Sequence, residues 1–186
     1  MWTRRQRQMC IRDRGYEVLL LDSPIIPHLM QKLESKKEKI KFSRVDSDTL
    51  ENLIKKDEEV ISKLTDEEKE KLKPMIETAV ENEKYTVQLE ALDSNSMPFM
   101  LAQPEFMRRM KEMQQTGGGA MGNLPEMYSL IVNTNHELVG KILNTRTEKK
   151  RNSLIKQSID LAKLSQNNLT GKDLTEFINR SIDLIK

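Results

Sequence analysis

Hydrophobic and polar residues alternate in short stretches of this chain, and hydrophobic residues recur at helical spacing in several longer ones. Residues 85–92 place apolar side chains on one side and polar side chains on the other, as in a half-buried strand. Residues 98–102 and 127–133 are short apolar runs, and each predicts a further strand. Three strands with one apolar face can form a small sheet backed by helices, so the pattern predicts an α+β fold.

Helical patterns surround these strands. Thr65-Asp66-Glu67-Glu68 is a capping box that predicts the start of a helix. A short helix is expected over 136–143, and two longer ones over 148–164 and from Thr170 to the end of the chain.

The last two predicted helices both carry wide apolar stripes and are joined by a tight link. Such a hairpin leaves an outer apolar face, and in a small domain the commonest cover is the same hairpin from a second copy. The sequence therefore predicts a homodimer held by a four-helix bundle. The residues expected at this dimer interface are Leu154, Ile155, Ile159, Leu174, Phe177, Ile178, Ile182 and Ile185.

The chain before these elements follows a strand–helix–strand pattern. Residues 15–21 are continuously apolar, apolar residues at helical spacing follow from Ile25 to Leu33, and residues 40–45 alternate. This order predicts a partial βαβ unit with a right-handed crossover. Its sheet partners would lie upstream, so the chain is expected to be a fragment of a longer protein.

Residues 97–128 hold seven of the eleven methionines and predict an amphipathic helix that opens at Pro104. Its apolar face carries Phe106, Met107, Met110 and Met113. This face fits either an ordinary core helix or an adaptable binding surface, because methionine is unbranched and polarisable. Pro104 and the glycine run 117–119 are expected to leave the helix loosely attached.

Composition adds two limits. The 186 residues correspond to one domain, or to one domain and a piece of another. Hydrophobic residues make up 37%, charged residues 32% and aromatic residues 4%, and no apolar run is long enough to span a membrane.

Residues 1–14 differ from the rest of the chain and are expected to be a non-native leader. Their stretch MCIRDR resembles translated sequencing-adapter DNA. Without their five arginines and one aspartate the net charge of +2 becomes −2, so the basicity gives no argument for nucleic acid. Cys10, the only cysteine, lies in this leader, so neither a disulfide framework nor a thiol nucleophile is expected.

Catalytic and metal motifs are missing from the sequence. His28 and His136 are the only histidines and neither has metal-ligand spacing, and the glycine run is not a phosphate loop. We therefore expect no enzyme and no cofactor in this chain. An alternative function, a nucleic-acid or ribosome-associated adaptor, would rest on Arg108, Arg109, Lys111 and the basic run 149–151.

Several separate blocks of the sequence, in order, are similar to the heat-shock protein 90 chaperones. They include GYEVLLLDSPI, KYTVQLEALDS, QPEFMRRMKEM and PEMYSLIVNTNHELV, followed by the final residues from SLIKQSIDL to the end. The resemblance covers about residues 15–186 and is greatest to the bacterial branch, high-temperature protein G.

The resemblance implies the roles of these blocks. Residues 15–46 would be the end of the middle domain, and residues 47–186 the C-terminal dimerisation domain. Phe106, Met107, Met110 and Met113 would contact unfolded clients, and the last two helices would pair with a second copy. ATP and Mg²⁺ would bind only to the N-terminal domain of the full-length parent. A cytoplasmic chaperone module follows, with itself and unfolded clients as partners, and with neither nucleic acid nor membrane as a partner.

Overall fold

The computed structural model describes residues 9, 11–13, 15–37, 39–45, 47, 48, 53, 60–80, 84–117, 127–166 and 168–185, except for the side chains of residues 115–117, 184 and 185. The chain divides into two compact units, which are described separately below. The first unit comprises residues 57–101 and 129–186. The second unit comprises residues 2–56 and 102–128.

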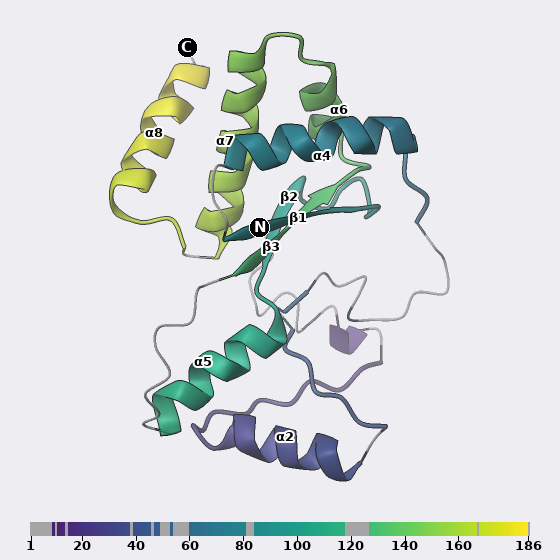
Figure 1. Ribbon diagram of the computed structural model, residues 1–186, viewed down its shortest axis with the longest axis vertical. Coiled ribbons are helices and arrows are strands. Elements are labelled where there is room, and N and C mark those ends of the chain that lie inside the picture. Colours follow the sequence, from purple (N-terminus) through teal and green to yellow (C-terminus); the bar gives the residue numbers. More distant parts are fainter. Residues whose placement is uncertain are drawn as a thin grey trace. The chain divides into compact units, whose positions relative to one another are not determined.

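A three-stranded sheet lies at the centre of the first unit (Figure 1). It contains β1 (Tyr85–Glu90), β2 (Phe99–Ala102) and β3 (Tyr128–Asn133), in the order β1-β3-β2. At the end of β3, the N–H of Thr134 donates to the Glu90 carbonyl at the end of β1, and the N–H of Asn133 donates to the Pro98 carbonyl before β2. Hence β3 runs parallel to β1 and antiparallel to β2, and the predicted α+β class with a three-stranded sheet is confirmed.

Four of the described helices belong to the same unit as this sheet. They are α4 (Asp66–Val80), α6 (Glu137–Asn144), α7 (Glu148–Ser165) and α8 (Gly171–Ile185). Helix α4 packs against β1, while α7 packs against α4, α6 and α8. In Figure 1, α7 and α8 stand side by side as a hairpin.

The predicted capping box starts α4. Thr65 Oγ1 accepts a hydrogen bond from the N–H of Glu68, and the Glu68 carboxylate accepts one from the N–H of Thr65 at 2.8 Å. These two bonds satisfy donors that the first helical turn leaves without partners. The local pattern therefore fixed this helix boundary correctly.

The core of the first unit lies between the sheet and these helices. Leu130, Ile131 and Val132 on the central strand β3 are all buried, although successive side chains of a strand point to opposite faces of the sheet. Helices α4, α6 and α7 contribute further side chains with almost no exposure, among them Leu72, Ile76, Val139, Ile142 and Ile155. Burial of such side chains is worth roughly 1.5–3 kcal/mol each.

Two buried asparagines hold the chain where it leaves β3. Asn133 Oδ1 accepts from the N–H groups of Leu92 and Asn135, and its Nδ2 donates to the Asp93 carbonyl at 2.8 Å. Asn135 accepts from the N–H of Lys63 and donates to the carbonyls of Leu92 and Ile61. These side chains replace the ladder bonds that three loop segments lack, so the polar groups remain paired although they are buried.

In the second unit, α2 (Ile26–Lys36) packs against α5 (Glu105–Gly117). The predicted helix of the βαβ unit is therefore present. The two flanking strands are wrong, because residues 15–21 and 40–45 contain no strand. A strand forms only with a ladder partner, and among the described residues neither segment has one.

Several predicted features lie outside the described residues. They include most of the leader 1–14, Gly118 and Gly119 of the glycine run, and the Ile185 side chain. Among the described helices, none is both long enough and apolar enough to cross a membrane.

Candidate functional site

Helix α5 carries the methionine-rich face that the sequence singled out. It begins at Glu105, directly after Pro104, and the N–H of Arg108 donates to the Pro104 carbonyl at 3.2 Å. Pro104 has no N–H to leave unpaired here, and the Glu105 carboxylate suits the positive end of the helix dipole. The predicted start at Pro104 therefore agrees with the structure to within one residue.

The apolar face of α5 is covered only in part. Phe106 is 68% exposed, the largest exposure of any aromatic side chain in the described residues. Met107, Met110 and Met113 are half-buried. The four side chains are thus on one helix that presents an aromatic ring to solvent beside three flexible thioethers.

A polar stripe of α5 is bound to residues 34–44. Arg109 Nη1 lies 2.6 Å from Glu34 Oε2, and Arg109 Nη2 donates to the Phe42 carbonyl at 2.6 Å. Arg109 Nε also lies 2.9 Å from Glu105 Oε1. Arg44 forms a two-point ion pair with Glu112.

These contacts shift the ionisation of their partners. The pKa of Glu34 is lowered by the hydrogen bond from Arg109 and by a second one from the N–H of Phe42. The pKa of Arg109 is raised, chiefly by the same bond to Glu34. The network overturns the expectation of a loosely attached helix, because Pro104 and the glycines are not the only attachments of α5.

The hairpin of α7 and α8 carries the predicted dimer residues. Ile155 and Ile159 on α7, and Phe177 on α8, are buried inside the unit, and Leu154 and Leu174 are half-buried. Ile178 and Ile182, one helical turn apart on α8, are each 48% exposed. Of the predicted residues whose side chains the structure describes, these two therefore offer the most apolar surface to a second copy.

Polar side chains fix the two helices of the hairpin to each other. Asp160 on α7 is buried and forms an ion pair with Arg180 on α8. Gln157 Nε2 donates to Ser181 Oγ at 2.7 Å, and Arg180 also reaches Gln157. A buried carboxylate is tolerated only when it is paired in this way, so the network sets the register of the hairpin.

Sequence reasoning missed some of these residues. Leu161 on α7 is 44% exposed and adds apolar surface to the hairpin. It belongs to the apolar pattern of the helix, but a stripe does not tell which members stay uncovered. Glu34 and Arg44 gave no signal at all, because their partners lie 75 and 68 positions away in the sequence.

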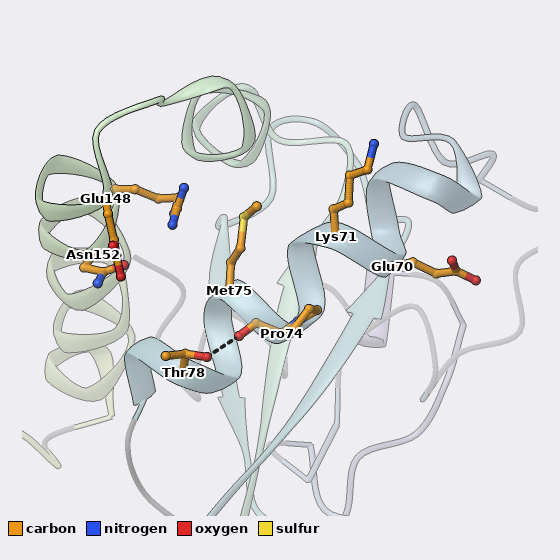
Figure 2. Close-up of a pocket in the computed structure, with 8 residues that line it drawn as sticks. Glu70, Lys71, Pro74, Met75, Thr78, Glu148 and Asn152 are labelled. Atoms are coloured by element: carbon orange, nitrogen blue, oxygen red, sulfur yellow. Dashed lines mark hydrogen bonds between the residues drawn. The ribbon is translucent and has the colours of Figure 1, made fainter.

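A pocket of about 470 Å³ lies between α4 and α7 (Figure 2). Figure 2 shows Met75 between the two helices, Glu148 and Asn152 on α7, and Glu70 directed away from them. The lining includes Pro74, which interrupts the hydrogen bonding of α4. These residue types offer no nucleophile with an adjacent base, and no pair of carboxylates in apolar surroundings.

Two other kinds of site were considered: a metal site, and a nucleic-acid surface made of basic residues. Among the residues that the structure describes, no group of three or more His, Cys, Asp or Glu side chains could hold a metal ion. Of the basic residues considered for nucleic acid, Arg109 already has its charge matched by Glu34 and Glu105.

No protein-family model matches the chain. It is similar to the chaperone protein HtpG of Porphyromonas gingivalis, with 40% identity over 157 residues, or 82% of this chain and 23% of that protein. Two further HtpG chaperones match at 30% identity in Bacteroides thetaiotaomicron and 29% in Bacteroides fragilis, over 93% and 94% of this chain and 36% of each relative.

The chain therefore spans about a quarter to a third of the length of these relatives. The matches cover 82–94% of the chain. These matches show that, over most of its length, the chain is homologous to chaperones named HtpG, which are members of the heat-shock protein 90 family.

Proposed function

We propose that this chain is the pairing and client-contact module of an ATP-dependent cytoplasmic chaperone. It contacts unfolded proteins through Phe106, Met107, Met110 and Met113, and it pairs with a second copy through the α7–α8 hairpin. The observation that carries the proposal is the 68% exposure of Phe106 on the methionine-rich face of α5. Binding of ATP by the parent protein is assigned to residues other than these.

The client surface is supported by the cost of leaving it uncovered. Burying one side chain such as phenylalanine or methionine is worth roughly 1.5–3 kcal/mol, so an exposed apolar face forgoes stability. Exposed apolar patches also promote aggregation unless they serve an interaction. Methionine side chains adjust to apolar segments of different shape, which suits a surface that binds many unfolded sequences.

Pairing is supported by the outer surface of the hairpin. Leu161 on α7 is 44% exposed, and Ile178 and Ile182 on the strongly amphipathic helix α8 are each 48% exposed. A second hairpin could cover them in a two-fold four-helix bundle. Two copies would then provide two client surfaces, and linked weak contacts gain affinity through effective concentration.

The client surface is tested by replacing Phe106, Met107, Met110 and Met113 together with Ser. The probe is reduced, carboxymethylated α-lactalbumin, which stays unfolded and soluble. We expect binding of the probe to be lost while the thermal transition and the oligomeric state are kept. The single variant Phe106→Ser should already weaken binding, because most of that ring is exposed.

Two control variants make the result interpretable. Ile61→Ser removes an apolar side chain that is 86% exposed in the first unit, and it should leave probe binding unchanged. Leu72→Ser removes a fully buried side chain and should unfold the first unit, at a cost of about 2–5 kcal/mol. If the quadruple variant melts as Leu72→Ser does, the methionine-rich face is core and the proposed client surface is wrong.

A further inference from the structure

The polar stripe of α5 is as regular as its apolar face. Glu105, Arg109 and Glu112 recur at i, i+4 and i+7, so they lie along one side of the helix. The apolar residues are centred more than a quarter turn away around the same helix. All three polar residues form ion pairs, and the partners outside the helix come from residues 34–44.

Arg109 is the first point of attachment, and its guanidinium is almost fully used. It contacts Glu105 through Nε, Glu34 through both terminal nitrogens, and the Phe42 carbonyl. Glu34 in turn accepts from the N–H of Phe42 at 2.7 Å, which closes a ring of hydrogen bonds. Only 16% of the Arg109 side chain and 24% of the Glu34 side chain remain exposed, so water screens this pair less than a surface pair.

Arg44 is the second point of attachment. It forms a two-point ion pair with Glu112, and its Nε lies 3.7 Å from Glu105 Oε1. The planar fork of a guanidinium on a carboxylate fixes direction as well as distance. Two such attachments at separate turns restrict both the sliding of α5 along its axis and its rotation about that axis.

We propose that Arg44 and Arg109 are positioning residues for the client surface, and that they hold α5 in the rotation that presents Phe106 and the methionines. This inference rests on the proposed function of that face. The helix axis is fixed while the side chains above it stay adaptable. A helix that is ordered before binding does not lose backbone freedom when the client binds. Its affinity for the client is therefore higher than that of a helix that must become ordered.

The test is a double-mutant cycle in the full 186-residue chain. Arg44→Gln and Glu112→Gln each remove one partner of the second attachment, and each is also made in the Phe106→Ser background. The dissociation constant for reduced, carboxymethylated α-lactalbumin is measured by fluorescence anisotropy. Hydrogen exchange of residues 105–114 reports the attachment of α5 without any client. The matched control is Lys69→Gln, which removes the same charge from the exposed Lys69–Asp66 pair of α4.

We expect Arg44→Gln and Glu112→Gln to speed exchange in α5 and to weaken probe binding by about threefold to tenfold, as coupled neighbouring residues do. In the Phe106→Ser background the same changes should have less than about a twofold effect, because the surface they position is already damaged. Lys69→Gln should change neither measurement. A merely structural role would weaken binding equally in both backgrounds.

Each other outcome is decisive. Unchanged exchange in Arg44→Gln and Glu112→Gln shows that the ion pairs do not hold α5, and it overturns the inference. Faster exchange with unchanged binding, or equal weakening in both backgrounds, overturns it as well. If wild type and Phe106→Ser bind the probe equally, the proposed client surface itself fails, and the exchange rates separate that failure from a failure of the attachment.

Discussion

Two side chains at and just after the end of β3 hold the backbone there through hydrogen bonds. Asn133 is fully buried and joins three backbone groups from two segments, and His136 begins the next helix three residues later. His136 Nδ1 accepts a hydrogen bond from the N–H of Leu138 at 3.0 Å, so the ring serves as the N-cap of α6. Both side chains make hydrogen bonds through specific lone pairs or N–H groups, so substitutions that remove these bonds should lower the stability of the chain.

Replacing Asn133 with Ala should strongly destabilise the chain. The change leaves the N–H groups of Leu92 and Asn135 and the carbonyl of Asp93 without these partners, at about 1–3 kcal/mol for each buried group. Asn133→Asp should also destabilise, because a carboxylate cannot donate to the Asp93 carbonyl. Urea unfolding measures the loss, and Asn179→Ala on the exposed side of α8 is the control. Equal midpoints for Asn133→Ala and wild type would contradict the assigned role.

Stability should depend on pH through His136. Burial lowers the pKa of His136 from its ordinary value of 6.5, against the opposite effect of Glu137. The unfolded state then binds the proton more readily, so the contribution of the neutral ring is complete above about pH 6.5 and is lost as the pH falls through the lowered value. Protonation also removes the lone pair of Nδ1 that accepts from Leu138.

The measurement compares wild type with His136→Asn at several pH values. Asn is a good N-cap and does not titrate, so the two proteins should have similar stability near about pH 8. Below about pH 6 wild type should lose stability relative to the variant. His136→Ala should be less stable than wild type near about pH 8 by about 0.5–2 kcal/mol, because the cap is absent, and this difference should shrink as protonation removes the cap from wild type. A constant difference between wild type and His136→Asn across this range would argue against the titration.

Among the elements, the α7–α8 hairpin has an inside and an outside that differ sharply. Its inner side chains, such as Ile155, are covered within the unit, while Ile178 and Ile182 remain half-exposed. The ion pair between Asp160 and Arg180 fixes the hairpin without any second copy. Pairing and folding of this hairpin can therefore be separated by substitution.

The double variant Ile178→Asp, Ile182→Asp should be monomeric and folded. Charges on the outer face would prevent a second hairpin from packing there, but both positions are exposed enough to tolerate them in a single copy. Sedimentation equilibrium gives the oligomeric state, and circular dichroism gives the fold. Ile155→Asp is the contrasting control and should unfold the unit, since that side chain is fully buried. Folded dimers of the double variant would place the interface elsewhere.

The sequence predicted where helices begin better than it predicted contacts between residues distant in the chain. Helix starts at Thr65 and near Pro104 were correct because capping and proline rules act within a few residues. The strands at 15–21 and 40–45 were wrong because a strand depends on a partner that local pattern does not reveal. The partial burial of the methionines and the binding of Arg109 to Glu34 depend on residues distant in sequence, which periodicity cannot identify. The domain boundary at residue 46 stays a prediction.

For the whole molecule, the proposal divides pairing and client contact between two sets of elements. Neither set contains the residue types that hold a nucleotide: the sequence has no phosphate loop, and its glycine run follows a helix. The chain spans only about a quarter to a third of its relatives, so their activities need not reside in it.

Calorimetry should accordingly detect no stoichiometric binding of ATP with Mg²⁺ to the purified chain. A full-length HtpG chaperone, titrated under the same conditions, is the comparison. Saturable heat from the 186-residue chain with a molar ratio near one would show that the assignment of nucleotide binding to other residues is wrong.

The methionine-rich face also makes α5 vulnerable to oxidants. Met107, Met110 and Met113 are only half-buried, so we expect peroxide to oxidise their sulfur atoms. Methionine sulfoxide is polar, so its formation would weaken the apolar contacts between this face and apolar client segments. Phe106 would be unaffected. Peroxide should therefore weaken probe binding, methionine sulfoxide reductases should restore it, and a variant with Leu at the three positions should resist the loss. Oxidation of three sulfur atoms would then stop the binding of unfolded chains by this face, and their reduction would restore it.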